Sequence, residues 1–577
     1  MADPLVLTEE QAAIVSAPAS SMAVIACPGS GKTATAVRRL VKLRADLETK
    51  KGRIALLSFS NVAVETFRRE YQELRGSPGH DSKVVIQTVD SFLSNYIIKP
   101  HCNRVMQCER APFLCFGEEP FLNTFRVGSR KAGFGMADLK FQRRSGRTII
   151  YKKVGRADPV ELMGDELKLT VEKFLAFAAT GGYTYDSGRV WARLLLEREP
   201  TITAALARRF PQILVDEAQD IGSFEGEIVN LLVAAGSSVS LIGDVHQSIY
   251  GFNFATGTYL SEFSERVGIS TFPLSQNRRS VAAIVSVADA IAGSRSKPHR
   301  ANVPRLSGAY FWKYQSSNLD ELVSRWRGHL TDNGYQPEDA AVLCRGTDLV
   351  ALLTTGGSSI GVSVVKYLAT AALERDRGTD IAAAFRHCAR AVTLLLDVPR
   401  DYYHEVTSST SKEDASLVRR HIWSMLREVN TGIPESTLPA RSVWLPRLKS
   451  NLADWLDVIE DVTSLRRTPT WRARVTAKQL PDTDPLLKID VDRTRLNGIR
   501  VGTVHSAKGE GIPAVLYLMK KKSLEGLLGG TAEEEGRIGY VAVTRARDLI
   551  VAAVPSSTSV ASLDRLRELG FREWLEG

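Results

Sequence analysis

Short apolar segments alternate with stretches of helical periodicity in the first part of the chain. Apolar runs with the length of a buried strand occur at 22–27, 53–58, 84–88, 213–215 and 239–242. Helical patterns follow the first two runs, through Leu40 and over about 62–74. Strands that are buried on both faces have continuous apolar sequences, so this pattern predicts a parallel sheet with helices on both sides.

The same alternation returns later in the chain. A helical stretch covers 281–293, and strand candidates follow at 340–344 and 361–367. Strand, turn and helix texture resumes over 499–555, with the apolar segments IRVGTVH, AVLYL, YVAVT and LIVAAV. We therefore predict an α/β fold with two parallel-sheet domains.

Two segments of different texture interrupt these domains. Over 101–157 there are twelve Lys and Arg against four Asp and Glu, and LKFQRRSGRTIIYKK alternates apolar with basic residues, which predicts strands. The stretch from about 161 to 206 is helical in pattern, and so is 376–490. Four tryptophans of the later segment are interpreted as core or interface residues: Trp423, Trp444, Trp455 and Trp471.

These changes of texture give four expected parts. They are a first sheet domain (1–95 and 201–275), a basic insertion (96–200), a second sheet domain (276–375 and 491–577) and a helical insertion (376–490). A chain of 577 residues is indeed too long for one hydrophobic core. The net charge of +10 favours a polyanionic partner, and most of it falls in the basic insertion.

Cysteine usage and the chain start indicate the compartment. Six cysteines without a CxxC pair favour a reducing cytosol. The start MADPLVLTEE lacks the basic region of a signal peptide, and no apolar run reaches about 20 residues, so we expect a cytoplasmic protein without a membrane partner. Buried thiols are the simpler interpretation of Cys102, Cys108 and Cys115 near His101, whose spacings match no common zinc pattern; a metal stays an alternative.

A phosphate-binding loop follows the first apolar run. The sequence ACPGSGKT (26–33) fits the P-loop pattern with Ala in place of the first Gly. Its loop residues, whose N–H groups can surround an anion at the start of a helix, are Pro28, Gly29, Ser30 and Gly31. Lys32 can reach the β and γ phosphates, and Thr33 can place its hydroxyl on Mg²⁺.

Carboxylates end the apolar segment ILVDE (213–217). Asp216 can hold Mg²⁺, and Glu217 can act as general base for the attacking water. An acidic pair alone is common on surfaces, but together with the P-loop it makes ATP hydrolysis the leading chemistry. Kinases, GTPases and transporters also use P-loops, so these residues leave the reaction class open.

Further motifs resemble those of the superfamily 1 helicases related to UvrD and Rep. The two that carry the resemblance are VDEAQD (215–220) and LIGDVHQSIYGF (241–252). The others follow in the family's order: LTEEQ (7–11), SFSNVAVE (58–65), TVDSF (88–92), LSQNRRS (274–280), TVHSAKGEG (503–511) and GYVAVTRAR (539–547). The resemblance spans almost the whole chain. It implies two RecA-like motor domains, each with an insertion subdomain, in the UvrD-type 1A, 1B, 2A and 2B arrangement.

The resemblance implies roles at an ATP site. Gln11 would bind the adenine edge, and Gln247 would sense the γ-phosphate or its water. Arg279 and Arg545 would act as arginine fingers from the second domain, with Arg537 in support. Placing these arginines across a cleft would make hydrolysis depend on closure, which is how ATP could drive motion.

It also implies a track for single-stranded or tailed DNA, with 3′-to-5′ movement. Three aromatics would stack on bases: Phe59, Tyr250 and Phe252. Four polar residues would contact phosphates: Ser60, Asn61, Thr88 and Thr503. His505 would link motif V to the ATP site. An ordinary core position is the alternative for Phe59 and Phe252.

Four motifs depart from the family pattern. Arg278 replaces the tyrosine that stacks on adenine, and its guanidinium can stack on the base instead. Glu510 is shifted by one residue in motif V, so its contact with the ribose stays open. Asp90 replaces the usual histidine of motif Ib and adds a negative charge near the DNA, and Val245 and His246 dilute the acidic run of motif III.

The compact plan and the KGEG sequence resemble UvrD-like helicases of bacterial anti-phage systems of the Gabija (GajB) type, which work with a separate nuclease. Only about 30 residues follow motif VI, so we expect no fused nuclease. Two functions stay open: a translocase that unwinds DNA, and a DNA-sensing ATPase that signals to a partner nuclease. We also expect Arg143, Arg144 and Arg147 of the basic insertion to bind duplex phosphates, with a solvated charged face as the alternative.

Overall fold

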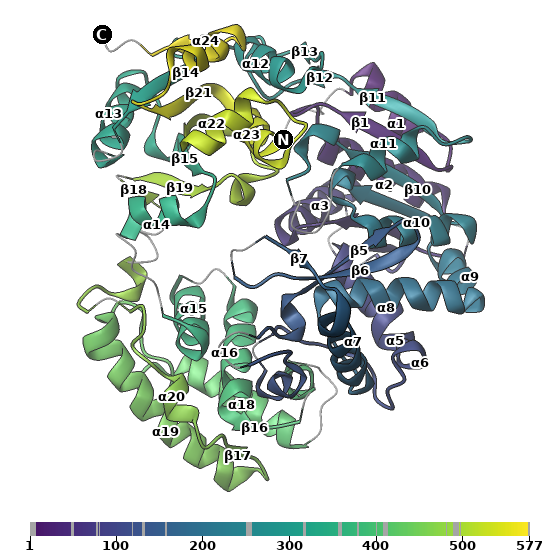
Figure 1. The fold of residues 1–577 in the computed structure, drawn as a ribbon, viewed down its shortest axis with the longest axis vertical. Helices are drawn as coiled ribbons and strands as arrows, with labels where there is room; N and C mark the ends of the chain where they lie inside the picture. The colour runs from purple at the N-terminus through teal and green to yellow at the C-terminus, as the bar shows by residue number, and fades with distance from the viewer. Residues whose placement is uncertain are drawn as a thin grey trace.

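The structure is a computed structural model of the chain. It describes residues 7–47, 51–76, 79, 81–117, 119–129, 133–155, 158–249, 257–315, 319–355, 361–377, 380–399, 401–407, 413–480, 482–488, 495–496 and 498–574. The fold class is as expected: α/β, with two RecA-like domains built on parallel sheets, each carrying an insertion (Figure 1). The residue boundaries of the four parts stay a prediction.

Six parallel strands form the sheet of the first RecA-like domain. They are β1 (Met22–Ala26), β2 (Ile54–Ser58), β3 (Val84–Thr88), β9 (Gln212–Asp216), β10 (Ser238–Gly243) and β11 (Ser270–Leu274), in the order β11-β1-β10-β9-β2-β3. The helices are α1 (Glu9–Ser16), α2 (Lys32–Asp46), α3 (Asn61–Arg75), α4 (Val89–Leu93), α10 (Ser223–Ala234) and α11 (Thr258–Ser264). Leu56 packs on the side of α1 to α3, whereas its neighbour Leu57 packs on the side of α4 and α10, so both faces are covered.

The first insertion lies between α4 and β9. Its helices are α5 (Lys99–His101), α6 (Asn103–Met106), α7 (Gly164–Ala179), α8 (Tyr185–Arg198) and α9 (Pro200–Arg209). Its strands form an antiparallel sheet of β5 (Leu139–Arg144), β6 (Arg147–Lys152) and β7 (Val160–Glu161), and a pair of β4 (Phe113–Leu114) with β8 (Gly182–Tyr183). The alternating basic segment is thus the expected hairpin, in which Leu139 and Phe141 point inward and are buried.

Seven strands form the second RecA-like sheet. They are β14 (Gly308–Tyr314), β15 (Ala340–Cys344), β18 (Arg495–Leu496), β19 (Ile499–Thr503), β20 (Ile512–Leu518), β21 (Ala546–Pro555) and β22 (Arg572–Glu573), in the order β18-β19-β15-β20-β21-β14-β22. Only β18 pairs antiparallel in this described sheet. The helices are α12 (Ala282–Ala292), α13 (Leu319–Asp332), α14 (Thr347–Thr355), α22 (Lys521–Leu528), α23 (Glu534–Arg545) and α24 (Val560–Glu568). A short parallel pair, β12 (Gln276–Asn277) with β13 (Lys297–Pro298), lies where the two domains meet.

The second insertion is helical, as expected, and has its own hydrophobic core. It contains α15 (Ser363–Arg377), α16 (Ile381–Leu395), α17 (Tyr402–Thr407), α18 (Glu413–Arg427), α19 (Leu445–Val462), α20 (Trp471–Arg474) and the strand pair β16 (Leu396–Asp397) with β17 (Arg466–Arg467). Trp444, Trp455 and Trp471 are buried in that core, and Trp423 stacks on Phe385.

Two apolar segments whose composition suits a β-strand are helical in the structure. The strand expected at 361–367 is wrong, because α15 begins at Ser363 and continues to Arg377. Its buried positions 364, 365, 368, 369 and 372 have helical spacing, which a seven-residue window hides. YVAVT lies inside α23, whose last ten residues are all buried, so it has no polar face to mark a helix.

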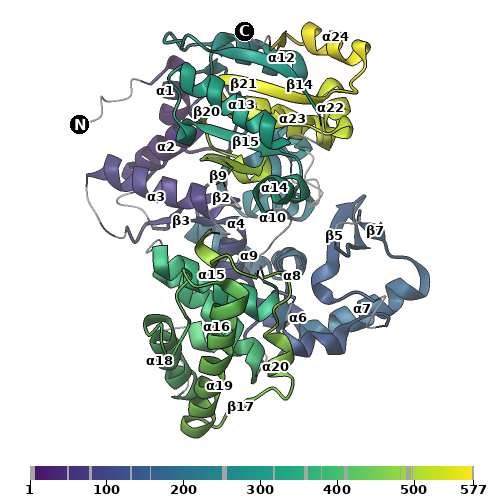
Figure 2. The same ribbon diagram turned by 90° about the vertical axis from the view of Figure 1, so that its left-hand side faces the viewer.

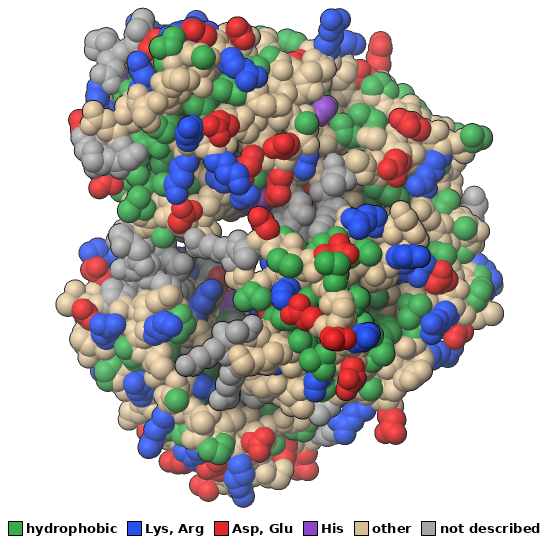
Figure 3. Space-filling view, in the orientation of Figure 1, with side chains coloured by type: hydrophobic (Ala, Val, Ile, Leu, Met, Phe, Trp, Pro, Cys, Tyr) green, Lys and Arg blue, Asp and Glu red, His purple; other side chains and the backbone are tan. Residues whose placement is uncertain are grey.

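The insertions lie below the two RecA-like domains and contact each other (Figures 1 and 2). His404 of α17 is hydrogen-bonded to the backbone of Leu114 in β4, with its Nε2 3.2 Å from the Leu114 nitrogen. The Arg390 guanidinium lies 4.0 Å from the centre of the Phe116 ring. Figure 3 shows the molecule hollowed between the second RecA-like domain and the helical insertion. None of the helices described here is long and apolar enough to cross a bilayer.

Candidate ATP site and nucleic-acid interface

Strand register brings the predicted ATP-site residues of the first domain together. Ile25 of β1 pairs with Gly243 of β10, and Ile242 pairs with Asp216 of β9. The P-loop that follows β1 therefore lies beside Asp216 and beside the segment after β10. Ligands of open parallel sheets bind at this carboxyl edge.

The P-loop turns through two glycines in the left-handed region. The angle φ is +69° at Gly29 and +80° at Gly31, where α2 begins. Side chains are strained there, so the turn requires glycine. The Ser30 hydroxyl donates to the Cys27 carbonyl at 2.8 Å, which fixes the loop from inside.

Gln11 is bonded to the protein on both sides of its amide. Its Oε1 accepts a hydrogen bond from the Thr8 N–H, and its Nε2 donates to the Ser30 carbonyl at 3.0 Å. In this conformation Gln11 fastens α1 to the P-loop. The adenine contact stays a prediction, and it requires the amide to use its remaining N–H or to exchange a bond.

Motif IV of the second domain packs directly on the P-loop. The Arg278 N–H donates to the Gly29 carbonyl at 3.0 Å. A Cβ at Gly29 would lie 2.5 Å from Arg279 Cβ and 2.8 Å from Asn277 Oδ1. Glycine therefore also permits the close approach of the second domain, which brings Arg279 over the site.

Two carboxylates lie at the end of β9, the buried Asp216 and the half-buried Glu217. Burial and the charge of Glu217 raise the pKa of Asp216. Burial opposes ionisation of Glu217 as well, but Lys32, Lys508 and a hydrogen bond from Gln219 lower its pKa. Glu217 also has φ of +55°, a strained backbone typical of functional sites.

Thr33 and Asp216 fit the predicted metal site. Both line a cavity of about 270 Å³ between the RecA-like domains. The Oδ1 of Asp216 is buried and has no hydrogen-bond partner among the described residues. A hydroxyl and a free carboxylate oxygen are ligands that Mg²⁺ prefers.

Side chains of the two domains meet at motif III. Arg545, the last residue of α23, donates from Nη2 to Gln247 Oε1 at 3.1 Å, and Gln247 Nε2 lies 3.4 Å from Thr544 Oγ1. Arg279 Nη1 donates to the Thr544 carbonyl at 3.2 Å. Burial and the charge of Arg545 lower the pKa of Arg279 to about 9. Two guanidinium groups therefore lie close together beside the P-loop, an arrangement that favours a bound anion.

Arg537 and Glu510 lie around this centre. Arg537 donates from Nε to the Ser248 carbonyl at 2.6 Å and so supports the segment after Gln247. Glu510 forms an ion pair with Arg500 and lines the cavity between the domains. Its contact with a ribose stays a prediction.

Sequence reasoning missed a second link between the domains. Lys508 of motif V forms an ion pair with Asp220, four residues after Asp216, and both side chains are buried. Burial raises the pKa of Asp220, and the charge of Lys508 lowers it. Both residues stand inside recognised motifs, so a charged motif residue without an assigned role was the available signal.

The predicted DNA-contacting residues of motif Ia lie at the mouth of the same cavity. Ser60 caps α3 by accepting the Ala63 N–H at 3.2 Å, and Asn61 is exposed in the first turn. Phe59 is half-buried and lines both this cavity and an apolar cavity behind it. Its ring is therefore partly a core residue, as the alternative supposed.

Motifs Ib and V continue this line. Thr88, paired in register with Ser58, caps α4 through the Ser91 N–H at 3.2 Å. Thr503 ends β19, and the His505 ring lies 3.1 Å from the Ile249 carbonyl, which connects motif V to motif III. Tyr250 and Phe252 lie outside the described residues.

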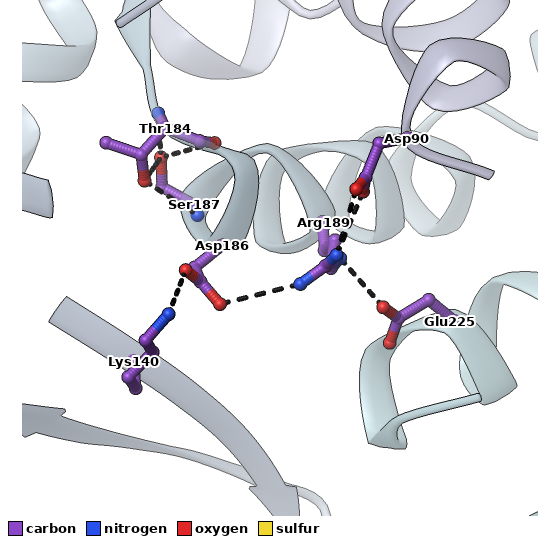
Figure 4. Close-up of polar contacts among 7 residues, drawn as sticks. All are labelled: Asp90, Lys140, Thr184, Asp186, Ser187, Arg189 and Glu225. Carbon is purple, nitrogen blue, oxygen red and sulfur yellow. Dashed lines mark hydrogen bonds and ion pairs between the residues drawn. The ribbon is translucent and has the colours of Figure 1, made fainter. Parts of the chain in front are cut away.

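Asp90, the added acidic residue of motif Ib, has a partner from the first insertion. Its carboxylate is bound by Arg189 of the first insertion, at 2.9 Å and 3.2 Å from Nη2 (Figure 4). Asp90 thus adds a carboxylate to motif Ib, as expected, and Arg189 is its cationic partner in this conformation. The partner lies 99 positions away in sequence, where motif comparison does not reach.

Arg143 is engaged within the protein in this conformation, and its expected role in binding duplex stays a prediction. Its side chain is 13% exposed and pairs with Glu227 of α10, and its N–H donates to Ser223 Oγ. Arg144 is 62% exposed and 3.8 Å from Glu161, and Arg147 is exposed at the hairpin turn. These two remain available to a phosphate.

The cysteines of the first insertion are held as thiols in its core. Cys102 and Cys115 are buried, and the Cys108 thiol donates to the Arg110 carbonyl at 3.2 Å. In the part of the chain that the structure describes, no group of three His, Cys, Asp or Glu side chains is placed to hold a metal ion.

Comparison with known proteins agrees with this geometry. The model of the UvrD/REP helicase N-terminal domain matches residues 7–154 and 166–268. The chain is similar to the ATP-dependent DNA helicase UvrD2 of Mycobacterium tuberculosis, with 22% identity over 94% of this chain and 78% of UvrD2. It is 22% identical to the putative ATP-dependent DNA helicase YjcD of Bacillus subtilis (67% of this chain, 56% of YjcD). DNA helicase II of Escherichia coli is 26% identical over 49% of this chain and 40% of its own length.

Proposed function

We propose that this chain is a UvrD-like ATP-dependent DNA helicase of superfamily 1, which moves 3′ to 5′ along single-stranded DNA and unwinds duplex ahead of it. The observation that carries the proposal is the direct contact of Arg545 with Gln247 beside the two carboxylates after β9. It joins groups from both domains at one site, so that closure and hydrolysis depend on each other.

We assign phosphate binding to the P-loop. The N–H groups of Gly29 to Thr33 surround the phosphates at the start of α2, and Lys32 neutralises the β and γ oxygens. Thr33 and Asp216 would hold Mg²⁺, which supplies positive charge to the phosphate oxygens when bound. Gln11 holds the loop's shape through Ser30.

Hydrolysis follows from the charges around the carboxylates. Glu217 is kept ionised by Lys32 and Lys508, so it can accept a proton from the attacking water. Gln247 orients that water or the γ-phosphate. The Arg279 and Arg545 guanidinium groups stabilise the charge that develops on the phosphoryl oxygens.

DNA binding follows from the line of motifs Ia, Ib and V at the cavity mouth. Ser60, Asn61, Thr88 and Thr503 contact phosphates, whereas Phe59, Tyr250 and Phe252 stack on bases. The His505 ring is hydrogen-bonded to the Ile249 carbonyl of motif III. Through this bond a conformational change in motif III is transmitted to motif V. Such contacts fix the register of a strand without reading its sequence.

Replacing Glu217 with Gln tests the active site. We expect it to abolish DNA-stimulated phosphate release while nucleotide binding persists, because the amide cannot accept the proton. Unchanged DNA-stimulated turnover would refute the assignment. Strand displacement from duplexes with a 3′ or a 5′ tail then tests movement: unwinding of the 3′-tailed duplex alone is expected.

A partnership with a nuclease is our second proposal. The KGEG sequence and the short helical insertion resemble the Gabija (GajB) type of anti-phage helicase. In that case the ATPase would sense DNA and signal to the nuclease, with weak unwinding of its own. ATPase activity on 3′-tailed DNA without strand displacement would favour this function. Size exclusion of the native complex tests it, since a monomer under all conditions contradicts a stable partner.

A further inference from the structure

Four charged side chains form a partly buried network around Arg189 where the first insertion meets the first RecA-like domain (Figure 4). Arg189 lies on α8 and is 11% exposed. Its guanidinium contacts Asp90 of α4 at 2.9 Å, Asp186 of α8 at 3.5 Å and Glu225 of α10 at 2.7 Å. Lys140 of β5 binds the other side of Asp186 at 2.7 Å.

The network connects three functional segments. Asp90 lies two residues after Thr88 of motif Ib, in the first turn of α4. Glu225 lies in the first turn of α10, which follows the VDEAQD motif. Lys140 lies on the basic hairpin of the insertion. Arg189 contacts the motif Ib segment and α10 directly. It is connected to the basic hairpin through Asp186, which also binds Lys140.

The local structure fixes Arg189 in place. Thr184 and Ser187 cap α8 reciprocally, the Ser187 N–H donating to Thr184 Oγ1 at 3.3 Å and the Thr184 N–H to Ser187 Oγ at 2.8 Å. The start of the helix is therefore defined. Asp186 and Arg189 follow in its first turns, where Asp186 contacts Lys140 of β5 and Arg189 contacts α4 and α10.

We propose that Arg189 is a positioning residue for DNA: it neutralises Asp90 at the motif Ib segment and holds that segment against α8 and α10. Because it concerns motif Ib as part of the DNA track, this inference rests on the proposed function. A carboxylate at this position would repel a phosphate held by Thr88 if its charge were uncompensated. In this chain the compensation comes from the insertion, so insertion and DNA track are coupled through one side chain.

The same helix offers a matched control. Arg193 lies one turn after Arg189 and is 15% exposed. It binds Glu227 of α10 at 2.6 Å, next to Arg143 of β5. Arg193 thus joins the same helices with the same charge and similar burial, but its partner is not on the DNA track.

Anisotropy of a fluorescent oligothymidylate without nucleotide measures the effect. Arg189→Met is expected to raise the Kd about tenfold, because Asp90 then repels the backbone. Arg193→Met is expected to stay within about twofold of the unmodified chain. Arg189→Met combined with Asp90→Asn is expected to recover most of the affinity, which a loss of scaffold alone would not do.

Steady-state ATPase separates positioning from catalysis. The DNA concentration for half-maximal stimulation is expected to rise about tenfold in Arg189→Met, with kcat at saturating DNA within about twofold. If that variant does not fold, Arg189→Gln with Glu225→Gln avoids an unpaired buried carboxylate and still exposes Asp90. The weak DNA binding is expected there too.

The outcomes separate the two proposals. An unmodified chain that fails to bind the oligonucleotide refutes the proposed function. An unmodified chain that binds, with equal losses in Arg189→Met and Arg193→Met or with no recovery by Asp90→Asn, overturns the role of Arg189.

Discussion

Lys508 and Asp220 form an ion pair across the two RecA-like domains, with 7% of the lysine and 1% of the aspartate side chain exposed. Each charge needs the other, because a single buried charge is strongly destabilising. The pair lies beside Glu217, whose pKa Lys508 helps to lower. This buried ion pair therefore stabilises the contact between the two domains next to the expected ATP site.

Removing one partner of this pair is predicted to cost more than removing both. Lys508→Met leaves Asp220 buried without its cation and is expected to lower the free energy of unfolding by about 3 kcal/mol. Adding Asp220→Asn to Lys508→Met is expected to recover much of that loss. Urea denaturation followed by tryptophan fluorescence measures both. Strictly additive losses would show that the two side chains do not interact.

Arg545 is predicted to act through its planar fork rather than its charge alone. Arg545→Lys keeps the charge but cannot contact both Gln247 and the phosphoryl oxygens, so kcat for ATP hydrolysis is expected to fall about 10³-fold. Nucleotide affinity is expected to change little. The control is Arg547→Lys, an exposed arginine two residues later. A similar loss of kcat in the control would contradict a specific role for Arg545.

Gly29 is predicted to be required for contact between the domains. Gly29→Ala places a methyl group 2.5 Å from Arg279 Cβ, so the second domain must withdraw and DNA-stimulated ATPase is expected to fall by about tenfold or more. Gly76→Ala is the matched control, because φ there is +67° but nothing lies within 4 Å of the added carbon. The backbone strain is then the same, and activity is expected to persist. Equal effects would mean that strain alone explains the loss.

Local sequence was sufficient where neighbouring residues decide the structure. The P-loop needs two left-handed glycines between a buried strand and a helix, and the printed order of Gly29 to Thr33 specifies that turn. The hairpin of β5 and β6 follows from the alternation of apolar and polar residues, clearest in Leu139 to Gln142. The motifs also identified Arg545 and Gln247, whose contact the structure then provides.

Long-range pairing was beyond local patterns. Arg143 and Arg144 are adjacent in sequence, yet Glu227 pairs with the first and leaves the second largely exposed. The sequence of motif Ib predicts the added carboxylate of Asp90 but not its partner Arg189. Such pairs depend on which helices meet, and periodicity does not contain that information. For the same reason the segment 361–367 was taken for a strand, since its valines suit either element until packing decides.

The contact between the insertions is predicted to weaken in acid. Burial and the charge of Lys99 lower the pKa of His404, against the opposing effects of the Leu114 hydrogen bond and Asp401. The contact therefore favours the neutral ring, and separation of the insertions takes up a proton. The contribution of His404 to docking is thus fully present above the ordinary pKa of 6.5 and is lost as the pH falls through the lowered pKa of the docked ring. Energy transfer between dyes at the exposed Lys168 of α7 and Lys449 of α19, followed from pH 7.5 downward, measures the separation of the insertions.

His404→Asn keeps a donor and an acceptor but does not titrate, so its energy transfer is expected to stay constant over the same range. An unchanged pH profile in that variant would assign the transition to other groups, because the asparagine contact with Leu114 has no proton to gain.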